Sequence, residues 1–554
     1  MLSDTAAASL FTRPSSRLRY IGERTISGQQ GIITHSGAFL DWWELTYRHL
    51  YRARNNRLVF SSGAASGPAE FTISGFSSSD LVLIDITDFF NPTVLTDTQI
   101  SGTGPYTLRF RDDLTAGPRR YAALARSNGG LQVASGALAL VHPTTLANPG
   151  TEPDYVIVVP DVRDVDGDGS PDDFAAEAQR LKQHRESKGH VVQILRLSDL
   201  YNEFDGGLAR SVAIRNYLRH AFSHWTRPPL YLLLAGDGSE DFRDKLATGV
   251  SVVPTELIIG PVIGDGDLQL VAADSWFVCG IAPGDVEFDD HLDMSVGRLP
   301  AQSASELRSL IDKTIEYENF APDDRWRSRI LTISDDSWSS TISFSAPYQF
   351  RIGERIFEAI SDTINSIVEN QSGVGDLIDS RALKLSVYTD PLPSDPCPQP
   401  GPCRSQAMAI SHFDTAGATT MYQLISDGNL LVNYQGHANA WTLAHEWIFY
   451  SEGVDQDQNR FNNLGRPGVW FVYACHPNQF GYRDERVGNV VGGRERGFGE
   501  LLVSLPDRGA VAAIGSSGFE YLPIGLGSGP PFQGDLNTPQ WEAFFLTPPD
   551  PDST

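Results

Sequence analysis

The spacing of apolar residues along the chain changes near residue 150. Upstream, short runs alternate apolar and polar residues and are separated by Gly, Ser, Asn and Asp, which is typical of antiparallel strands with one buried face. The runs are GIITHSGAF (31–39), RLVFSS (57–62), AEFTISGF (69–76), DLVLIDITD (80–88), YTLRFRDD (106–113), RRYAALAR (119–126) and LALVHP (138–143). The sequence predicts an all-β sandwich domain over residues 25–150, after an unstructured lead over residues 1–24.

Downstream, apolar strand-like runs alternate with helical ones, which predicts an α/β fold with a parallel sheet covered by helices. The predicted strands are 155–160, 191–197, 230–236, 330–334, 430–436, 469–475 and 510–516. The predicted helices are 173–187, 212–222, 304–320 and 349–364. We expect two parts, a first α/β subdomain over residues 151–325 and a second over residues 326–554, which carries His437 and Cys475.

The helix predicted over 304–320 illustrates the pattern. Leu307, Leu310, Ile311 and Thr314 recur at helical spacing and define its buried face. Ser303, with Glu306 three residues later, predicts a capping box at its start.

Two of the predicted strands run directly into chemically reactive residues. LLVNYQG (430–436) leads into His437, and VWFVYA (469–474) leads into Cys475. Ligands of such sheets bind beyond the carboxyl ends of the strands. A cysteine peptidase needs a thiol beside an imidazole that takes its proton and later protonates the leaving amine. The structural alternative is a buried core thiol and a hydrogen-bonded histidine.

Further segments resemble the gingipain family of cysteine peptidases over about residues 153–525, closest in layout to its larger, sortase-like members. The matching segments, in the order of the family, are LLLAGD (232–237), ADSWF (273–277), VGRLP (296–300), NYQGH (433–437), VYAC (472–475) and IGSS (514–517). The resemblance implies a caspase-like fold, with Cys475 as the nucleophile and His437 as the general base and acid.

The resemblance also implies an oxyanion hole formed by the backbone N–H groups of Cys475 and Ala438. Ala438 departs from the family, which usually has glycine after the histidine. An alanine keeps the N–H group, so the hole survives if the backbone angle is one that alanine adopts. His476, directly after the nucleophile, either tunes the thiolate or faces away on a turn.

Asp274 lies in the acidic-aromatic motif of the family. In the Arg- and Lys-specific members, an acidic residue of this motif lies in or near the specificity site, where a carboxylate pairs with a cationic side chain. Asp274 is therefore a candidate for substrate specificity, or for the third group that orients the histidine. A turn cap or a calcium ligand is the alternative.

The segment DVDGDGSPDD (164–173) resembles an EF-hand calcium loop. Asp164, Asp166, Asp168 and Asp172 stand at ligand positions, with Gly169 at the sixth position. Ala175 replaces the usual bidentate Glu. We expect structural calcium here, and an acidic turn that caps the next helix is the alternative.

The chain carries a formal charge of −26, which disfavours nucleic acid as a partner and suits calcium or cationic substrates. No apolar run is long enough to span a membrane, so we expect no transmembrane segment. Among the four cysteines, Cys397 and Cys403 bracket a Pro/Gly loop that could close as a disulfide. The N-terminus lacks the apolar core of a signal peptide, and we interpret the chain as a fragment of a secreted or cell-surface protein.

These observations predict a cysteine endopeptidase that acts on proteins or peptides, with Arg or Lys before the cut if Asp274 sets the specificity. Residues 41–60 resemble the stretch before the catalytic domain in sortase-like members, so transpeptidation is the alternative chemistry. A degenerate, non-catalytic binding module is a second alternative. A lowered pKa of Cys475 would favour the enzyme, whereas an ordinary thiol pKa would favour the binding module.

Overall fold

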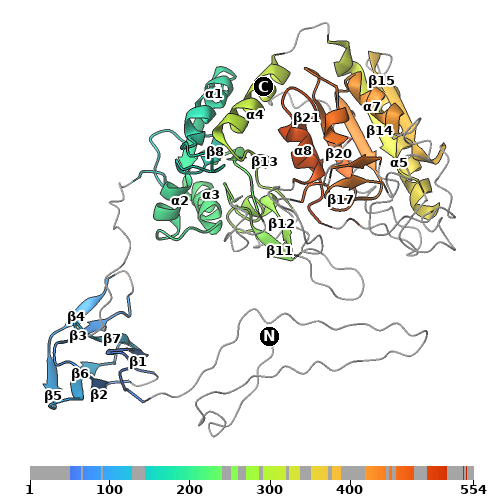
Figure 1. Ribbon diagram of the computed structural model, residues 1–554. Coiled ribbons are helices and arrows are strands. Elements are labelled where there is room, and N and C mark those ends of the chain that lie inside the picture. Colours follow the sequence, from blue (N-terminus) through green and yellow to red (C-terminus); the bar gives the residue numbers. More distant parts are fainter. Residues whose placement is uncertain are drawn as a thin grey trace, which may run out of the picture. The chain divides into compact units, whose positions relative to one another are not determined.

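The computed structural model describes residues 50–63, 66–88, 91–127, 144–239, 251–259, 270–285, 291–319, 324–336, 351–371, 377–387, 418–444, 448–451, 457–479, 496–518, 520, 541 and 545. Residues 1–24, the runs 31–39 and 138–143, and the pair Cys397 and Cys403 lie outside this part of the chain. The chain divides into two compact units, Met1–Val141 and His142–Thr554 (Figure 1). The boundary falls several residues before the predicted position.

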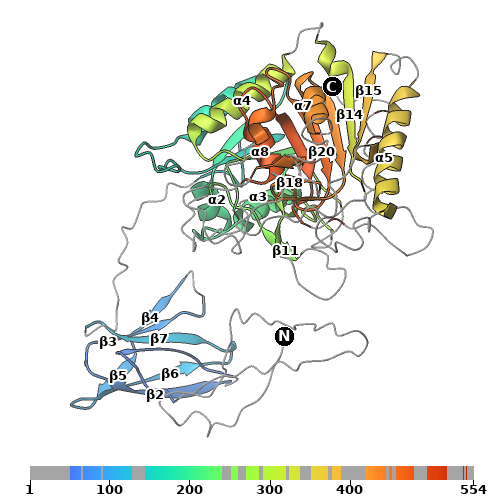
Figure 2. The ribbon, with the colours of Figure 1, turned by 45° about the vertical axis from the view of Figure 1, so that its right-hand side comes forward.

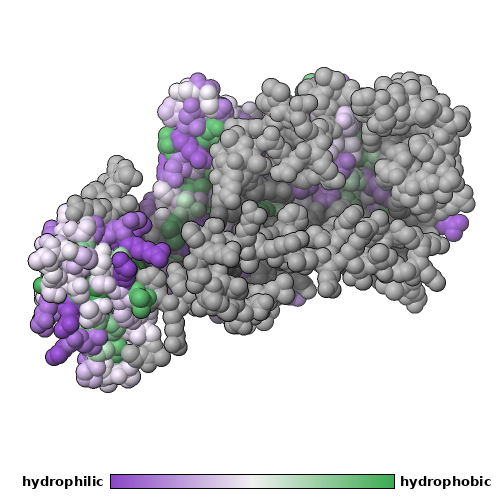
Figure 3. Space-filling model, turned by 60° about the horizontal axis from the view of Figure 1, so that its bottom comes forward, coloured by the Kyte–Doolittle hydropathy of each residue, from purple (hydrophilic) through white to green (hydrophobic). Residues whose placement is uncertain are grey.

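The first unit consists of two antiparallel sheets, ordered β1-β7-β3-β4 and β2-β6-β5. The strands are β1 (Arg57–Ser61), β2 (Pro68–Phe76), β3 (Leu81–Asp85), β4 (Thr93–Leu95), β5 (Thr98–Ser101), β6 (Tyr106–Asp113) and β7 (Arg120–Ala125). In β6, Leu108 and Phe110 are buried while Arg109 and Arg111 are exposed, because successive side chains point to opposite faces. Residues of both sheets form one apolar core, and the surface seen in Figure 3 is largely hydrophilic with scattered apolar residues.

The second unit begins with a parallel sheet in the order β13-β10-β8-β9. Its strands are β8 (Tyr155–Val159), β9 (Val192–Arg196), β10 (Tyr231–Ala235) and β13 (Ser295–Leu299), and its helices are α1 (Phe174–Ser187), α2 (Leu197–Phe204), α3 (Val212–His224) and α4 (Ala304–Glu318). Val156 and Val158 pack with α2 and α3, whereas Ile157 and Val159 pack with α1 and α4. Both faces of the sheet are therefore covered, as Figures 1 and 2 show.

A second parallel sheet has the order β15-β14-β16-β20-β21. Its strands are β14 (Arg329–Ser334), β15 (Asp379–Lys384), β16 (Leu431–Gln435), β20 (Gly468–Tyr473) and β21 (Ala510–Gly515), and its helices are α5 (Arg351–Glu369), α7 (Ala418–Ser426) and α8 (Phe498–Ser504). One face packs with α7 and α8 in a core that is continuous with that of α1 and α4. The opposite face packs with α5. The two sheets thus share one core within this unit.

Shorter elements complete the second unit. They are β11 (Leu257–Ile259), β12 (Leu270–Ala272), β17 (Ala438–Asn439), β18 (Thr442–Leu443), β19 (Phe449–Tyr450), and the 3-10 helices η2 (Asp274–Phe277), η3 (Arg325–Ser328), η5 (Leu385–Val387) and η7 (Asp457–Arg460). Across the helices that the structure describes, none is both long and apolar enough to cross a membrane.

The structure contains all seven strands predicted downstream of residue 153, and it adds β13 and β15 to the two parallel sheets, besides the short strands β11, β12, β17, β18 and β19. β13 and β15 lie at the edges of the parallel sheets, where polar residues such as Arg298 and Arg381 interrupt the apolar pattern. Ser303 caps α4 by accepting from the Glu306 N–H at 3.3 Å. The Glu306 side chain, however, accepts from the Gln302 N–H at 2.8 Å and pairs with Arg496, so the predicted capping box is only half formed.

Candidate active site

The strand register brings three chemically reactive residues to one edge of the second sheet. Ser334 of β14 is paired with Gln435 of β16, which is paired with Tyr473 of β20. His437 and Cys475 each lie two residues beyond these paired positions, on neighbouring strands. Because adjacent strands are about 4.8 Å apart, the histidine and the cysteine leave the sheet side by side.

Asp335, directly after β14, contacts the histidine. Its Oδ2 accepts from the His437 backbone N–H at 2.7 Å and lies 2.9 Å from Nδ1 of the ring, while Oδ1 accepts from the Asp336 N–H. The Asp335 side chain is almost fully buried. A carboxylate in this position fixes the ring orientation and favours the tautomer with the proton on Nδ1. Sequence analysis missed Asp335, although it follows the predicted strand 330–334 just as Cys475 follows its own.

Gly436 makes this contact possible. A Cβ atom at Gly436 would collide with the Asp335 side chain and would lie 2.8 Å from the Tyr434 hydroxyl. That hydroxyl donates to the His437 carbonyl at 2.7 Å and accepts from the Ala444 N–H at 3.0 Å. Asp335 therefore fixes the N–H group of His437, and Tyr434 fixes its carbonyl group.

Cys475 is partly buried, and its Sγ donates to the Glu520 carbonyl oxygen at 3.4 Å. Burial, together with the nearby negative charge of Glu520, raises the pKa of the Cys475 thiol. This direction is opposite to the lowered pKa that a preformed thiolate requires. By the criterion stated above, the pKa of Cys475 therefore does not favour the enzyme over the binding module, and a thiol that keeps its proton needs a base to take it before it can react.

The turn after Cys475 has a constrained backbone. His476 has a φ of 62°, in the left-handed region that non-glycine residues rarely adopt, and its N–H donates to the Gly518 carbonyl. Burial lowers the pKa of His476. A neutral imidazole supplies no positive charge to the thiolate. This favours the interpretation that His476 faces away on a turn over the one in which it tunes the thiolate.

Ala438 lies in β17, opposite Leu443 of β18, and is not among the residues with positive φ. The Ala444 N–H donates to the His437 carbonyl at 2.9 Å. Pairs alternate between hydrogen-bonded and non-hydrogen-bonded in an antiparallel ladder, so the Ala438 N–H points away from β18. The backbone angle thus suits alanine, and the N–H remains oriented out of the hairpin.

Asp274 does not contact His437. Its two carboxylate oxygens accept from Nε and Nη2 of Arg298, each at 2.7 Å, and from Thr255 at 3.0 Å. Asp335 occupies the place of the group that orients the histidine, which corrects that interpretation of Asp274. The bidentate ion pair also engages both oxygens that a substrate cation would need.

Glu520 is a second acidic residue that sequence analysis missed. Besides its carbonyl contact with Cys475, its carboxyl is close enough for its charge to raise the pKa values of Cys475 and Tyr473. Burial raises the pKa of Glu520 itself to about 8. A buried carboxyl with a raised pKa beside a thiol is a typical feature of functional sites.

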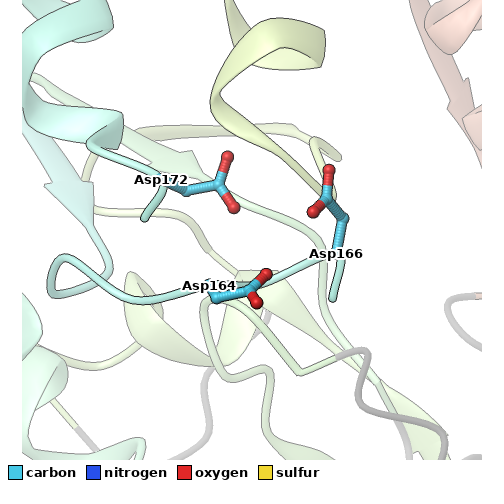
Figure 4. A group of neighbouring side chains, drawn as sticks. All are labelled: Asp164, Asp166 and Asp172. Atoms are coloured by element: carbon cyan, nitrogen blue, oxygen red, sulfur yellow. The ribbon is translucent and has the colours of Figure 1, made fainter. Parts of the chain in front are cut away.

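A group of carboxylates lies in the acidic loop before α1. One carboxylate oxygen from each of Asp164, Asp166 and Asp172 lies within 4.8 Å of the others, and Asp168 is not in this group (Figure 4). Gly169 has a φ of +89°, as a glycine at the sixth position of a calcium loop permits. Asp173 accepts from the Ala176 N–H and caps α1, so the helix-capping alternative is present alongside the carboxylate group.

A parallel α/β sheet that places a carboxylate-backed histidine beside a cysteine is the arrangement of a cysteine-type peptidase. Residues 148–545 match the model of peptidase family C25, and the chain belongs to this family, that of the gingipains. No curated protein sequence matches significantly.

Several solved structures resemble this chain at low sequence identity. The complex of the pro- and mature domains of RgpB from Porphyromonas gingivalis is 17% identical and covers 66% of this chain and 64% of that one, with a TM-score of 0.42. The Arg-specific cysteine proteinase gingipain R is 16% identical, covering 67% and 65%, with a TM-score of 0.41. Dimeric latent PorU from P. gingivalis is 20% identical, covering 50% and 25%, with a TM-score of 0.33. This chain thus matches less than two thirds of each of these proteins.

Proposed function

We propose that this protein is a cysteine endopeptidase in which Asp335, His437 and Cys475 act together on protein or peptide substrates. The observation that carries the proposal is the 2.9 Å contact between Asp335 and Nδ1 of His437, on the strand next to the one that carries Cys475. With Nδ1 donating to Asp335, Nε2 is the nitrogen that would exchange a proton with the thiol.

The reaction follows from the protonated resting thiol. His437 takes the Sγ proton as the sulfur attacks the substrate carbonyl carbon, and the carbonyl electron pair moves onto oxygen. The N–H groups of Cys475 and Ala438 would donate to that oxyanion. Collapse breaks the C–N bond, and the imidazolium gives its proton to the leaving amine. Water, deprotonated by His437, then cleaves the thioester and regenerates the thiol.

We further propose that cleavage follows Arg or Lys, and that Glu520 recognises the cation. Asp274 is paired with Arg298, whereas no cation in the described part of the chain lowers the pKa of Glu520, which burial raises to about 8. A bound guanidinium or ammonium would favour the ionised carboxylate. Binding of the substrate cation to Glu520 would also bring a positive charge near Cys475.

A mixed peptide library tests both proposals. The wild type is expected to cut after Arg and Lys, and Cys475→Ala to cut nothing. Glu520→Gln should keep turnover on other sites but lose the preference for cationic residues by about 10- to 100-fold, the usual cost of a lost charge-assisted hydrogen bond. Asp274→Asn is the matched control and should keep the preference.

The remaining outcomes discriminate between functions. Cleavage with an unchanged preference in Glu520→Gln would reject the specificity proposal but not the peptidase. Turnover that appears only with an added amine nucleophile would indicate transpeptidation. A folded wild type with a reactive thiol and neither activity would favour the binding module.

We also propose that Asp164, Asp166 and Asp172 hold a structural calcium ion, and that the protein acts outside the cell or at its surface. Three clustered carboxylates supply the hard oxygen donors that calcium prefers, and backbone carbonyls and water would complete its six to eight ligands. Extracellular calcium concentrations would support occupancy of such a loop.

A further inference from the structure

A pair of buried acids lies between the first sheet and α8 of the second. Asp237, after β10, is 1% exposed, and Glu500, in α8, is 4% exposed. Their carboxyl groups lie close enough that each shifts the pKa of the other. Two ionised carboxylates have no hydrogen to donate, so a hydrogen bond between the pair requires that one of them carries a proton.

The other contacts of the pair account for only one oxygen on each side. Gln302 Nε2 donates to Asp237 Oδ2 at 2.6 Å, and the Gly497 N–H donates to Glu500 Oε2 at 3.0 Å. Asp237 Oδ1 and Glu500 Oε1 are buried and receive no donor from the described residues. A proton shared between the carboxyls supplies the missing donor.

The charges around the pair are already matched by other groups. Arg298 forms its bidentate pair with Asp274, and Arg496 pairs with Glu306 at 2.5 Å. Lys313 of α4 also faces α8, and it donates to carbonyl oxygens at the far end of that helix. Four carboxyls therefore face two guanidiniums in this buried region, which disfavours ionisation of both members of the pair.

The first turn of α8 packs against the loop that follows the nucleophile. The Gly499 N–H donates to the Pro477 carbonyl at 2.9 Å. A Cβ atom at Gly497 would lie 2.6 Å from the Gln479 carbonyl, and one at Gly499 would collide with Asn478. The position of α8 thus constrains residues 477–479, immediately after Cys475 and His476.

We propose that Asp237 and Glu500 share one proton, and that this protonated pair holds α8 against the first sheet and so positions the turn that carries Cys475. Glu500 is then a positioning residue, since it acts through α8 and touches no reacting atom. The positioning role rests on the proposed peptidase function, whereas the shared proton does not.

The proton makes stability depend on pH with a defined sign. Burial, followed by the charge of Asp237, raises the pKa of Glu500 well above its ordinary value of 4.5. Above pH 4.5 the folded protein keeps a proton that the unfolded chain has lost, so this contribution to stability falls as pH rises until the folded-state pKa is passed. Glutamine imitates the protonated acid and does not titrate.

Urea unfolding between pH 5 and 9 tests the shared proton, in a Cys475→Ala background that removes the titrating nucleophile. The stability of this parent minus that of its Glu500→Gln variant should fall steadily with pH. Lys313 cancels in this difference because both proteins contain it. Asp237→Asn should also reduce the slope, and Glu186→Gln, on the exposed surface of α1, should not. Identical slopes for the parent and Glu500→Gln would overturn the proposal.

Infrared spectroscopy gives a test that needs no variant of the pair. A Glu520→Gln protein, which lacks the other strongly raised glutamate, should still show a protonated carboxyl band at pH 7. Absence of this band would mean that both acids are ionised and would overturn the proposal.

Turnover tests the positioning role. Glu500→Gln should retain kcat within about threefold at neutral pH, while Glu500→Ala, although folded, should lose about tenfold or more in kcat with little change in KM. A folded Glu500→Ala with wild-type kcat would overturn the positioning role and leave the shared proton to be judged by unfolding. An inactive wild type would instead contradict the proposed function alone.

Discussion

At the residue scale, the site depends on how closely two strand ends approach each other. Gly436 has no Cβ, and the Asp335 carboxylate fills the space where one would lie. That space lets a single oxygen of Asp335 accept from both the backbone and the ring of His437. The orientation of the imidazole is therefore decided by a residue about a hundred positions away in the chain.

Asp335→Asn should lower kcat by about 100-fold, the scale of positioned acid–base catalysis, while KM changes little. An amide in place of the carboxylate no longer favours the proton on Nδ1 or stabilises the imidazolium that forms during the reaction. Steady-state kinetics on a peptide substrate measures this effect.

Asp274→Asn provides the contrasting control. It breaks the buried pair with Arg298, so it should lower the free energy of unfolding and leave the kcat of the folded fraction nearly unchanged. A large loss of kcat in Asp274→Asn, together with a nearly unchanged kcat in Asp335→Asn, would mean that Asp274 and not Asp335 acts with His437.

At the element scale, α4 joins the two sheets of the second unit. The N–H of Ala304, its first residue, donates to Asp172 at 2.6 Å, and Glu306 in its first turn pairs with Arg496. Further along, Lys313 donates to the carbonyl oxygens of Val503 and Leu505, at the end of α8. The helix thus links the acidic loop, the segment before α8 and the end of α8.

Lys313→Met should lower the free energy of unfolding by about 2–3 kcal/mol, because the buried carbonyl groups lose their donor while the apolar stem is kept. Urea denaturation at pH 8 measures the loss. Lys384→Met, which removes an exposed ion pair with Asp362, should change stability by about 1 kcal/mol at most.

Lys313 also contributes a pH dependence of its own. Burial lowers its pKa from 10.5 to about 7. Between these values the unfolded chain binds a proton that the folded protein lacks, so this contribution to stability rises with pH. The rise should be absent in Lys313→Met, and its persistence there would show that another group causes it.

At the scale of the whole molecule, the chain builds two units with separate cores. The β unit encloses its own aromatic-rich core, while the two parallel sheets of the second unit share theirs. The formal charge of −26 makes bound cations a general source of stability in such a protein.

Calcium should therefore raise the melting temperature of the whole protein if it binds to the acidic loop. At 100 times its Kd the ion adds about 2.7 kcal/mol, and chelation should remove this gain. Asp166→Asn should abolish the response, and Asp173→Asn, which alters only the cap of α1, should keep it. A response unchanged in Asp166→Asn would place the ion elsewhere.

Local pattern was enough to predict much of this protein. The apolar runs marked the seven strands, because a strand buried on both faces must be apolar throughout. The strand-end rule singled out His437 and Cys475 before any tertiary contact was known. Helical spacing identified the face of α4 that packs on the core, with Leu307, Leu310 and Ile311 all buried.

Only the tertiary structure determined which charged side chains interact with one another. Asp274 and Asp335 are both acids beside aromatic or strand residues, and nothing local distinguishes them. Strand order places Asp335 beside His437, whereas the packing of η2 against β13 brings Asp274 to Arg298. The pairing of Asp237 with Glu500 likewise joins positions more than 250 residues apart in the chain. Hydrophobic periodicity determines which face of an element is buried, but the partner of a buried charge depends on how the elements are arranged around it.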